Sequence, residues 1–131
     1  MSQPAPPILV VDDDPDLLLM LATALELDGR RVVTATNGVE ALQQAERHRP
    51  SLIVLDLMLP IVSGEAFRET QLADGALRSI PVLVVSARHD AEDVAARMKA
   101  IGYLSKPLSL ETFIGLVNAT LPERQTNERQ G

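Results

Sequence analysis

Five polar residues of this chain stand at or just after the ends of apolar segments. They are Asp12, Asp13, Asp56, Ser86 and Lys106. Carboxylates that lie close together repel one another and resist ionisation. A hard divalent cation relieves that repulsion, and Mg²⁺ accepts one or two carboxylates together with waters and phosphate oxygens. If the fold brings these residues together, their types predict a Mg²⁺ site.

The same set of residues suits phosphoryl transfer to a carboxylate. That reaction needs a free carboxylate beside a metal that other carboxylates hold, and cations that neutralise the transferred group. Lys106 supplies a second positive charge and Ser86 a hydroxyl for hydrogen bonding. No general base is needed, because an ionised aspartate is already a nucleophile.

Apolar segments and helical patterns alternate along the chain and predict the elements that position these residues. Continuous apolar segments are typical of strands buried on both faces of a parallel sheet. The predicted strands are residues 8–11, 31–35, 52–55, 80–85 and 101–104. The predicted helices are residues 15–28, 39–48, 65–72, 90–100 and 110–121. This order predicts a parallel sheet with helices on both faces and right-handed crossovers.

Residues at the helix ends support these boundaries. Asp14 and Ser109 are typical N-caps, and Gly29 is a typical residue for the end of a helix. Asp90, followed by Asp93, resembles a capping box. In an open sheet of this type, ligands bind outside the carboxyl ends of the strands. The five polar residues should therefore meet at that edge.

Length and composition indicate one acidic domain. The 131 residues suit a single core, with a Pro-rich arm at residues 1–7 expected to be disordered, a domain at 8–121 and a polar tail at 122–131. The net charge of −6, scattered basic residues and 2% aromatic residues argue against direct nucleic-acid binding. Cysteine is absent, and no apolar segment is long enough for a membrane span. We expect a cytoplasmic protein.

Four motifs carry a resemblance to a known family. They are VVDDDP, LIVLDLMLP followed by Gly64, VLVVSA and YLSKP. Each motif alone is weak, but together they resemble the response-regulator receiver domain over residues 8–121. The resemblance implies an α/β, flavodoxin-like fold: a doubly wound five-stranded parallel sheet, (βα)5, with strand order 2-1-3-4-5.

The resemblance also implies roles for the metal and acceptor residues. Asp56 matches the phosphoacceptor. Asp13 matches a direct Mg²⁺ ligand, and Asp12 a ligand that acts through water. Asp56 itself and the backbone carbonyl of Met58 complete the implied metal site.

The remaining motif residues match the switch of the family. Ser86 matches the hydroxyl residue that moves toward the phosphoryl group, and Lys106 the lysine that pairs with it. Tyr103 matches the aromatic residue that turns inward on activation. The bond between Lys106 and Pro107 should be cis, and Pro60 and Gly64 match the loop that carries the acceptor. Arg88 and Met58 fall where the family tunes its dephosphorylation rate.

The implied function is that of a single-domain response regulator in a two-component system. A histidine kinase or a histidine phosphotransfer protein donates the phosphoryl group, and the face formed by the fourth helix, fifth strand and fifth helix then regulates an unknown downstream protein. We expect a monomer, with dimerisation on phosphorylation left open. A receiver domain cut from a longer regulator or hybrid kinase fits equally well.

Two alternatives belong to other classes. Phosphatases of the haloacid dehalogenase type also use an aspartate nucleophile, but they need a second acid two residues later, where this chain has Met58. We therefore expect no turnover of an external substrate. The other alternative is a protein-interaction module that works without phosphorylation, although all five site residues are present.

Two features of the sequence go beyond the family motifs. Between Ser86 and Tyr103 the chain is about two residues shorter than the common family pattern, so the fourth helix should differ in length or pose. Leucines also crowd the first helix, where helical spacing predicts a core stripe of Leu17, Met20, Leu21, Ala24 and Leu25. Leu18 on the flank and Leu19 on the polar side are then candidates for an apolar surface that docks the histidine-bearing partner.

Overall fold

The computed structural model describes residues 5–122 and shows a parallel sheet of five strands. The strands are β1 (Ile8–Val11), β2 (Val32–Ala35), β3 (Leu52–Leu55), β4 (Val82–Ser86) and β5 (Gly102–Ser105). Their order in the sheet is β2-β1-β3-β4-β5, which confirms the predicted fold class and strand order. Neighbouring strands β1 and β3 are buried along their whole length, as their continuous apolar sequences predict.

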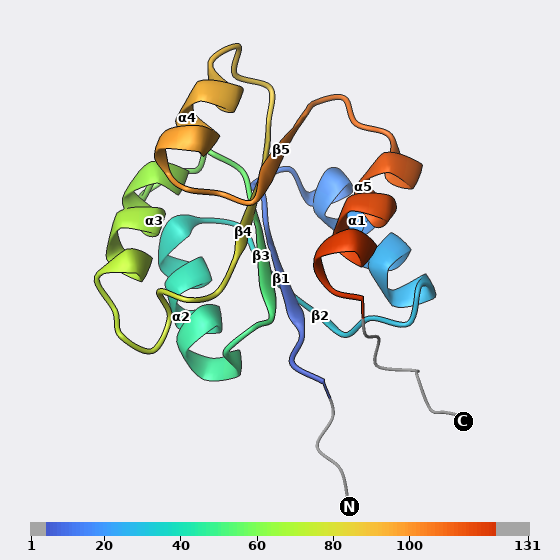
Figure 1. Cartoon of the computed structure of the whole chain (residues 1–131), viewed down its shortest axis with the longest axis horizontal. Helices are drawn as coiled ribbons and strands as arrows, with labels where there is room; N and C mark the ends of the chain where they lie inside the picture. The colour runs from blue at the N-terminus through green and yellow to red at the C-terminus, as the bar shows by residue number, and fades with distance from the viewer. Residues whose placement is uncertain (1–4, 123–131) are drawn as a thin grey trace, which may run out of the picture.

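Five helices cover the two faces of the sheet (Figure 1). They are α1 (Pro15–Leu27), α2 (Gly38–His48), α3 (Gly64–Leu72), α4 (Ala91–Arg97) and α5 (Leu110–Thr120). Helices α1 and α5 pack on one face, and α2, α3 and α4 lie on the other. The alternating side chains of β1 to β4 therefore fill two separate apolar cores, one on each side of the sheet.

Short polar side chains begin four of the five helices. Asp14, Asn37, Ser63 and Ser109 each accept a hydrogen bond from a backbone N–H in the first turn. The predicted capping box at α4 was wrong, because the Asp90 side chain makes no capping hydrogen bond. Its carboxylate pairs with the Arg88 guanidinium instead.

The first helix is rotated relative to the stripe that its sequence predicts. Leu18 is only 7% exposed and packs in the core with Leu21 and Leu25, whereas Met20 is 49% exposed and Leu17 is half-buried. The predicted place of Met20 in the core and of Leu18 on the flank was therefore wrong. Several consecutive leucines allow more than one helical phase, and packing against the sheet and α5 selects one of them.

The beginning of the domain lies earlier than the sequence indicates. Pro7 is buried, and its carbonyl accepts a hydrogen bond from the Ser51 amide at 2.9 Å. The Arg31 guanidinium donates to the Ala5 carbonyl at 2.7 Å. Residues 5–7 of the expected disordered arm are thus held against the domain. Residues 1–4 of that arm and residues 123–131 of the tail lie outside the described part of the chain.

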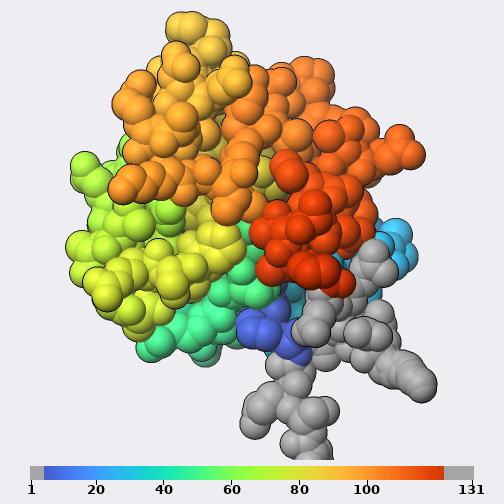
Figure 2. Space-filling model, in the orientation of Figure 1, coloured from blue at the N-terminus to red at the C-terminus, as the bar shows by residue number. Residues whose placement is uncertain are grey.

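The fourth helix is short, as the shortened segment before Tyr103 predicts. It spans Ala91–Arg97 and not residues 90–100. The chain then turns through Lys99, which has a left-handed backbone (φ 58°), before β5 begins. Figure 2 shows α4, the chain around β5 and α5 side by side on one face of the molecule. This face is the one that the family resemblance assigns to output.

Candidate metal and phosphoacceptor site

The carboxyl edge of the sheet brings the predicted acidic residues together. Val11 at the end of β1 pairs with Leu55 at the end of β3, so Asp12 and Asp56 emerge side by side. The Asp56 amide donates to the Val11 carbonyl at 3.1 Å, which continues the ladder by one residue. One ligand oxygen of each of Asp12, Asp13 and Asp56 lies within 4.8 Å of the others.

These three carboxylates differ in their surroundings. Asp12 and Asp56 are buried, whereas Asp13 is exposed. The Asp14 amide donates to Asp12 Oδ1 at 2.9 Å, and the Met58 amide donates to Asp56 Oδ1 at 3.2 Å. Only hard oxygen ligands converge here, with an open side at Asp13. This donor set fits a hydrated Mg²⁺ ion.

Lys106, in the loop that follows β5, joins the two buried aspartates. Its Nζ lies 2.8 Å from Asp12 Oδ2 and 3.1 Å from Asp56 Oδ2. The Lys106–Pro107 peptide bond is cis, as expected. Burial disfavours the charged ammonium, but the hydrogen bonds to Asp12 and Asp56 outweigh it and raise the pKa of Lys106. The lysine therefore supplies a fixed positive charge beside the acceptor.

The surroundings of Asp56 disfavour its ionised form. Burial raises the pKa of Asp56, and the neighbouring charge of Asp12 adds to this effect. The Met58 amide and Lys106 lower that pKa in part, but the net shift is upward. A cation at this edge favours the ionised form of Asp56, which is the nucleophilic form.

Close packing behind Asp56 fixes the loop between β3 and α3. A Cβ atom on Gly64 would lie 2.5 Å from the Asp56 carbonyl oxygen and 2.7 Å from Leu57 Cα. Both neighbours are backbone atoms that cannot yield, so a side chain here would displace the acceptor. The Gly64 amide also donates to the Leu57 carbonyl at 3.0 Å. Glycine at this position thus keeps the first turn of α3 directly under the acceptor.

The predicted switch residues lie in β4 and β5. Ser86, the last residue of β4, is buried, and its Oγ accepts a hydrogen bond from the Arg88 amide at 3.2 Å. Tyr103 in β5 is half-buried and packs against the core beneath α2, α3 and α4. Met58 is 60% exposed beside the acceptor. The movements of Ser86 and Tyr103, and the part of the Met58 carbonyl in metal binding, stay predictions.

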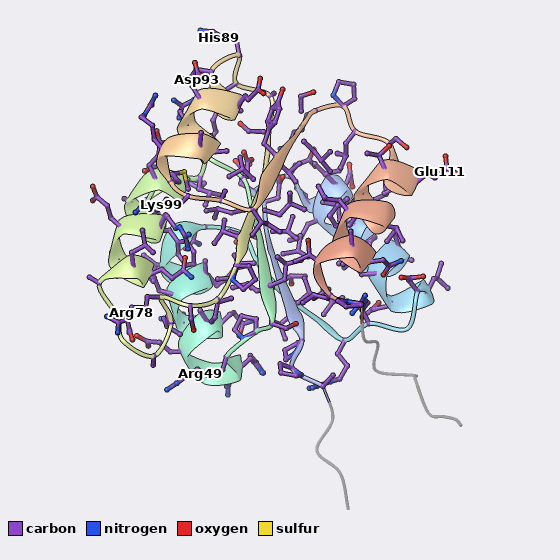
Figure 3. The ribbon with its side chains drawn as sticks, in the orientation of Figure 1. Arg49, Arg78, His89, Asp93, Lys99 and Glu111 are labelled. Carbon is purple, nitrogen blue, oxygen red and sulfur yellow. The ribbon has the colours of Figure 1, made fainter. Side chains whose placement is uncertain are left out.

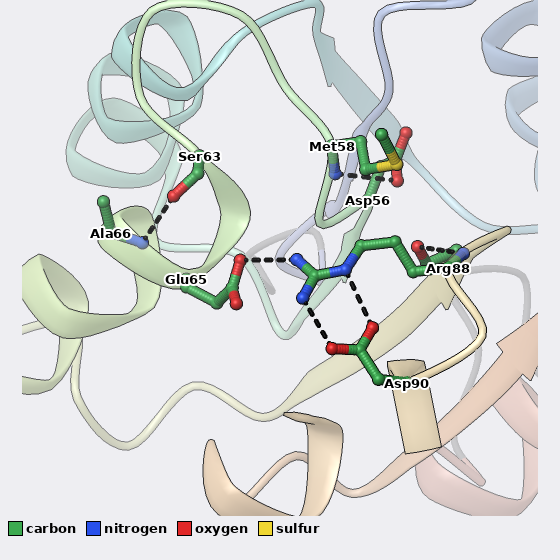
Figure 4. Close-up of polar contacts among 8 residues, drawn as sticks. Asp56, Met58, Ser63, Glu65, Ala66, Arg88 and Asp90 are labelled. Atoms are coloured by element: carbon green, nitrogen blue, oxygen red, sulfur yellow. Dashed lines mark hydrogen bonds and ion pairs between the residues drawn. The ribbon is translucent and has the colours of Figure 1, made fainter. Parts of the chain in front are cut away.

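Sequence reasoning missed an ion-pair cluster next to the site. Arg88 Nη1 lies 2.9 Å from Glu65 Oε1 in the first turn of α3, and Arg88 Nη2 lies 2.9 Å from Asp90 Oδ2 (Figure 4). Glu65 and Arg88 are far apart in the sequence, so no local pattern reveals their contact. His89, which lies between Arg88 and Asp90 in the sequence, is exposed at the tip of the loop (Figure 3).

Comparison with known proteins places the chain in a family. The family model of the response regulator receiver domain matches residues 8–118. The chain therefore belongs to the response regulator receiver domain family. Among residues 5–122, no helix has both the length and the apolar character needed to cross a membrane.

Curated relatives include regulators of two lengths. The chain is 39% identical over 122 residues to the transcriptional regulatory protein PrrA of Mycobacterium tuberculosis. The alignment covers 92% of this chain and 52% of PrrA. The chain thus spans about half the length of that relative. The chain is also 31% identical over 116 residues to protein PilH of Pseudomonas aeruginosa. That alignment covers 87% of this chain and 96% of PilH.

Solved structures agree with the fold. The chemotaxis response regulator CheY4 of Vibrio cholerae superimposes with a TM-score of 0.82 at 26% sequence identity, over 89% of this chain and 99% of CheY4. A receiver domain of a Francisella response regulator superimposes with a TM-score of 0.80 at 27% identity. The five-stranded architecture is thus shared with receiver domains.

Proposed function

We propose that this protein accepts a phosphoryl group on Asp56 from a histidine kinase or a histidine phosphotransfer protein, in a reaction that requires Mg²⁺. The observation that carries the proposal is the cluster of Asp12, Asp13 and Asp56, in which the Lys106 ammonium group pairs with Asp12 and Asp56. Asp56 has a carboxylate oxygen within 3.1 Å of that cation, and the open side of the site lies toward exposed Asp13.

Each residue has a role that its position supports. Asp12 and Asp13 hold the metal, which neutralises charge on the phosphoryl oxygens when bound. Asp56 Oδ attacks phosphorus, the bond from phosphorus to the histidine nitrogen breaks, and the imidazole leaves with its electron pair. Lys106, whose Nζ lies 3.1 Å from Asp56 Oδ2, stabilises the negative charge of the transferred group. The hydrogen bond from the Met58 amide orients the Asp56 carboxylate.

The phosphorylated state then acts through a change in population. The phosphoryl group draws in the Ser86 hydroxyl, and Tyr103 turns inward. Ser86 pairs with Ser105 of β5, and Tyr103 is itself in β5, so both residues are next to the face of α4, β5 and α5. That face binds a downstream protein in one of its two states. Hydrolysis of the phosphoaspartate resets the protein, and no external substrate is turned over.

The relatives support this function without naming its target. PrrA is by name a transcriptional regulator about twice as long as this chain, whereas PilH is of similar length. A single-domain regulator like PilH in length, or the receiver part of a longer regulator, both fit the proposal. For the docking of the phosphodonor, Leu18 is excluded by its burial. Leu19, at 68% exposed, stays the candidate.

Intact-protein mass spectrometry tests the proposal directly. The wild type and Asp56→Asn are incubated with acetyl phosphate, with Mg²⁺ or with EDTA. We expect a single phosphoryl adduct on the wild type with Mg²⁺, and none with EDTA or on Asp56→Asn, because the nucleophile and the metal are both required. An adduct that persists on Asp56→Asn would mean that another residue is the acceptor.

The absence of any adduct would favour the alternative of a module that works without phosphorylation. Asp13→Asn serves as the matched control, since it removes a carboxylate from the metal cluster but leaves the acceptor in place. This variant should form the same adduct, but only at a higher Mg²⁺ concentration.

A further inference from the structure

The Arg88 side chain connects two elements that have no covalent link nearby. Its guanidinium makes a two-point contact with Asp90, with Nε and Nη2 each 2.9 Å from a carboxylate oxygen. Its third nitrogen, Nη1, reaches Glu65 Oε1 at 2.9 Å (Figure 4). Asp90 belongs to the same loop as Arg88, whereas Glu65 belongs to α3. Through Glu65, the Arg88 guanidinium therefore ties the loop to α3.

The backbone of Arg88 holds the predicted switch hydroxyl. Its amide donates to Ser86 Oγ at 3.2 Å, and Ser86 is fully buried at the end of β4. Any movement of the Ser86 hydroxyl toward a phosphoryl group on Asp56 must break this bond or carry the Arg88 backbone with it. A loop that is tied down at Arg88 therefore resists that movement.

The anchor on α3 is rigid. The first turn of α3 is capped by Ser63, whose Oγ accepts from the Ala66 amide at 3.1 Å. Its first residue, Gly64, packs directly against the backbone of Asp56 and Leu57. The Glu65 carboxylate thus stands on the structure that also carries the phosphoacceptor.

We propose that Glu65 is a positioning residue of the switch, which holds Arg88 and so keeps the Ser86 hydroxyl in its unphosphorylated position. This inference rests on the proposed function and adds to it a residue from outside the five motif positions. When the Ser86 loop moves toward the phosphoryl group, the contact between Glu65 and Arg88 breaks, while the local pair of Arg88 and Asp90 travels with the loop.

The expected effect is modest, because the pair is partly exposed. The Arg88 and Glu65 side chains are 28% and 41% exposed, so solvent screens their attraction. Ion pairs of this kind shift a two-state equilibrium by about two- to fivefold. Removing Glu65 should raise the population of the switched loop, and with it the rate of phosphorylation, by this factor. Salt screens the same attraction in the wild type.

The test measures the rate of phosphorylation by acetyl phosphate with Mg²⁺ in a set of matched variants. Glu65→Gln removes the contact to α3, whereas Asp90→Asn removes an equal charge but only weakens the contact inside the loop. Both changes are repeated in an Arg88→Gln background. An amide NMR spectrum without phosphodonor reports directly on the hydrogen bond from Arg88 to Ser86.

We expect Glu65→Gln to speed phosphorylation by about two- to fivefold and to shift the Arg88 amide signal, while Asp90→Asn does less. In the Arg88→Gln background, Glu65→Gln should have no further effect. Equal rates for Glu65→Gln and the wild type would overturn the inference alone. The inference would also be overturned if Glu65→Gln still raised the phosphorylation rate in the Arg88→Gln background. That result would mean that Glu65 acts by repelling the anionic phosphodonor and not through Arg88. A wild type that forms no adduct would instead overturn the proposed function.

Discussion

Two polar clusters of this domain differ in their balance of charge. At the carboxyl edge of the sheet, the three carboxylates of Asp12, Asp13 and Asp56 lie together, and one lysine, Lys106, pairs with Asp12 and Asp56. Between α3 and the end of α4, the guanidinium of buried Arg68 has neutral partners. It donates to the carbonyls of Met98 and Lys99 at 3.0 and 3.2 Å and to Gln71 Oε1 at 2.8 Å.

The second cluster is satisfied within the fold. Gln71 is buried, and its amide nitrogen donates to the carbonyls of Leu77 and Ile80, each at 2.9 Å. Arg68 thus sits at the carbonyl end of α4, where a cation interacts favourably with the helix dipole. In Figure 3, Lys99 lies on the side of α4 that faces α3. Helix α4 is shorter than predicted, and the hydrogen bonds of Arg68 anchor its last turn.

The difference separates a structural from a functional use of buried charge. The cluster around Arg68 has its hydrogen bonds supplied by the protein, and it stabilises one conformation. The acidic cluster has more negative than positive charge, so it is incomplete without a further cation. The acidic site thus lowers stability but can bind a cation. Helix α4 is fixed at one end by Arg68 and held at the other end by the weaker contact of Arg88.

The largest effect is expected on breaking the satisfied cluster. Arg68→Met should lower the free energy of unfolding by about 2–4 kcal/mol, because the buried acceptors at Met98 and Gln71 and the partly buried acceptor at Lys99 lose their donor. The backbone carbonyls remain in the variant, and the methionine side chain cannot donate hydrogen bonds to them. Urea unfolding measures the change, and Arg78→Met, at an exposed position of the following loop, is the control. Equal midpoints for both variants would contradict the structural role.

A smaller effect, of opposite sign, is expected at the acidic cluster without Mg²⁺. Burial raises the folded-state pKa of Asp56, so its contribution to stability is fully present below the unfolded pKa and is lost as the pH rises through the folded value. Asp56→Asn cannot ionise, so it should be more stable than the wild type at neutral pH in EDTA. This advantage should shrink as the pH falls toward the unfolded pKa. Urea unfolding of both proteins over a pH series measures it, and an advantage that is independent of pH would contradict the assigned cause.

The smallest effect on stability is expected at the exposed pair beside the site. Arg88→Gln should change the urea midpoint much less than Arg68→Met, because the contacts of Arg88 are open to solvent and those of Arg68 are not. Its small effect should also fade as NaCl is added, whereas that of Arg68→Met should persist. Comparable losses in the two variants would remove the distinction between a fixed and a releasable end of α4.

Local patterns in the sequence determined the framework and the edge where the site forms. Continuous apolar segments predicted the buried strands, and residues such as Asp14 and Ser109 predicted where helices begin. The acidic residues after β1 and β3 were predicted to meet, because parallel strands present their carboxyl ends at one edge. All of these signals act over a few residues, where backbone geometry and propensity decide.

Only the tertiary structure decided which side chains meet across the domain. Leu18 and not Met20 entered the core, because the apolar run of α1 allowed several helical phases and packing chose one. The contacts of Glu65 with Arg88, and of Arg68 with the end of α4, join residues far apart in the chain. Such contacts depend on how the layers pack, and no local pattern encodes them.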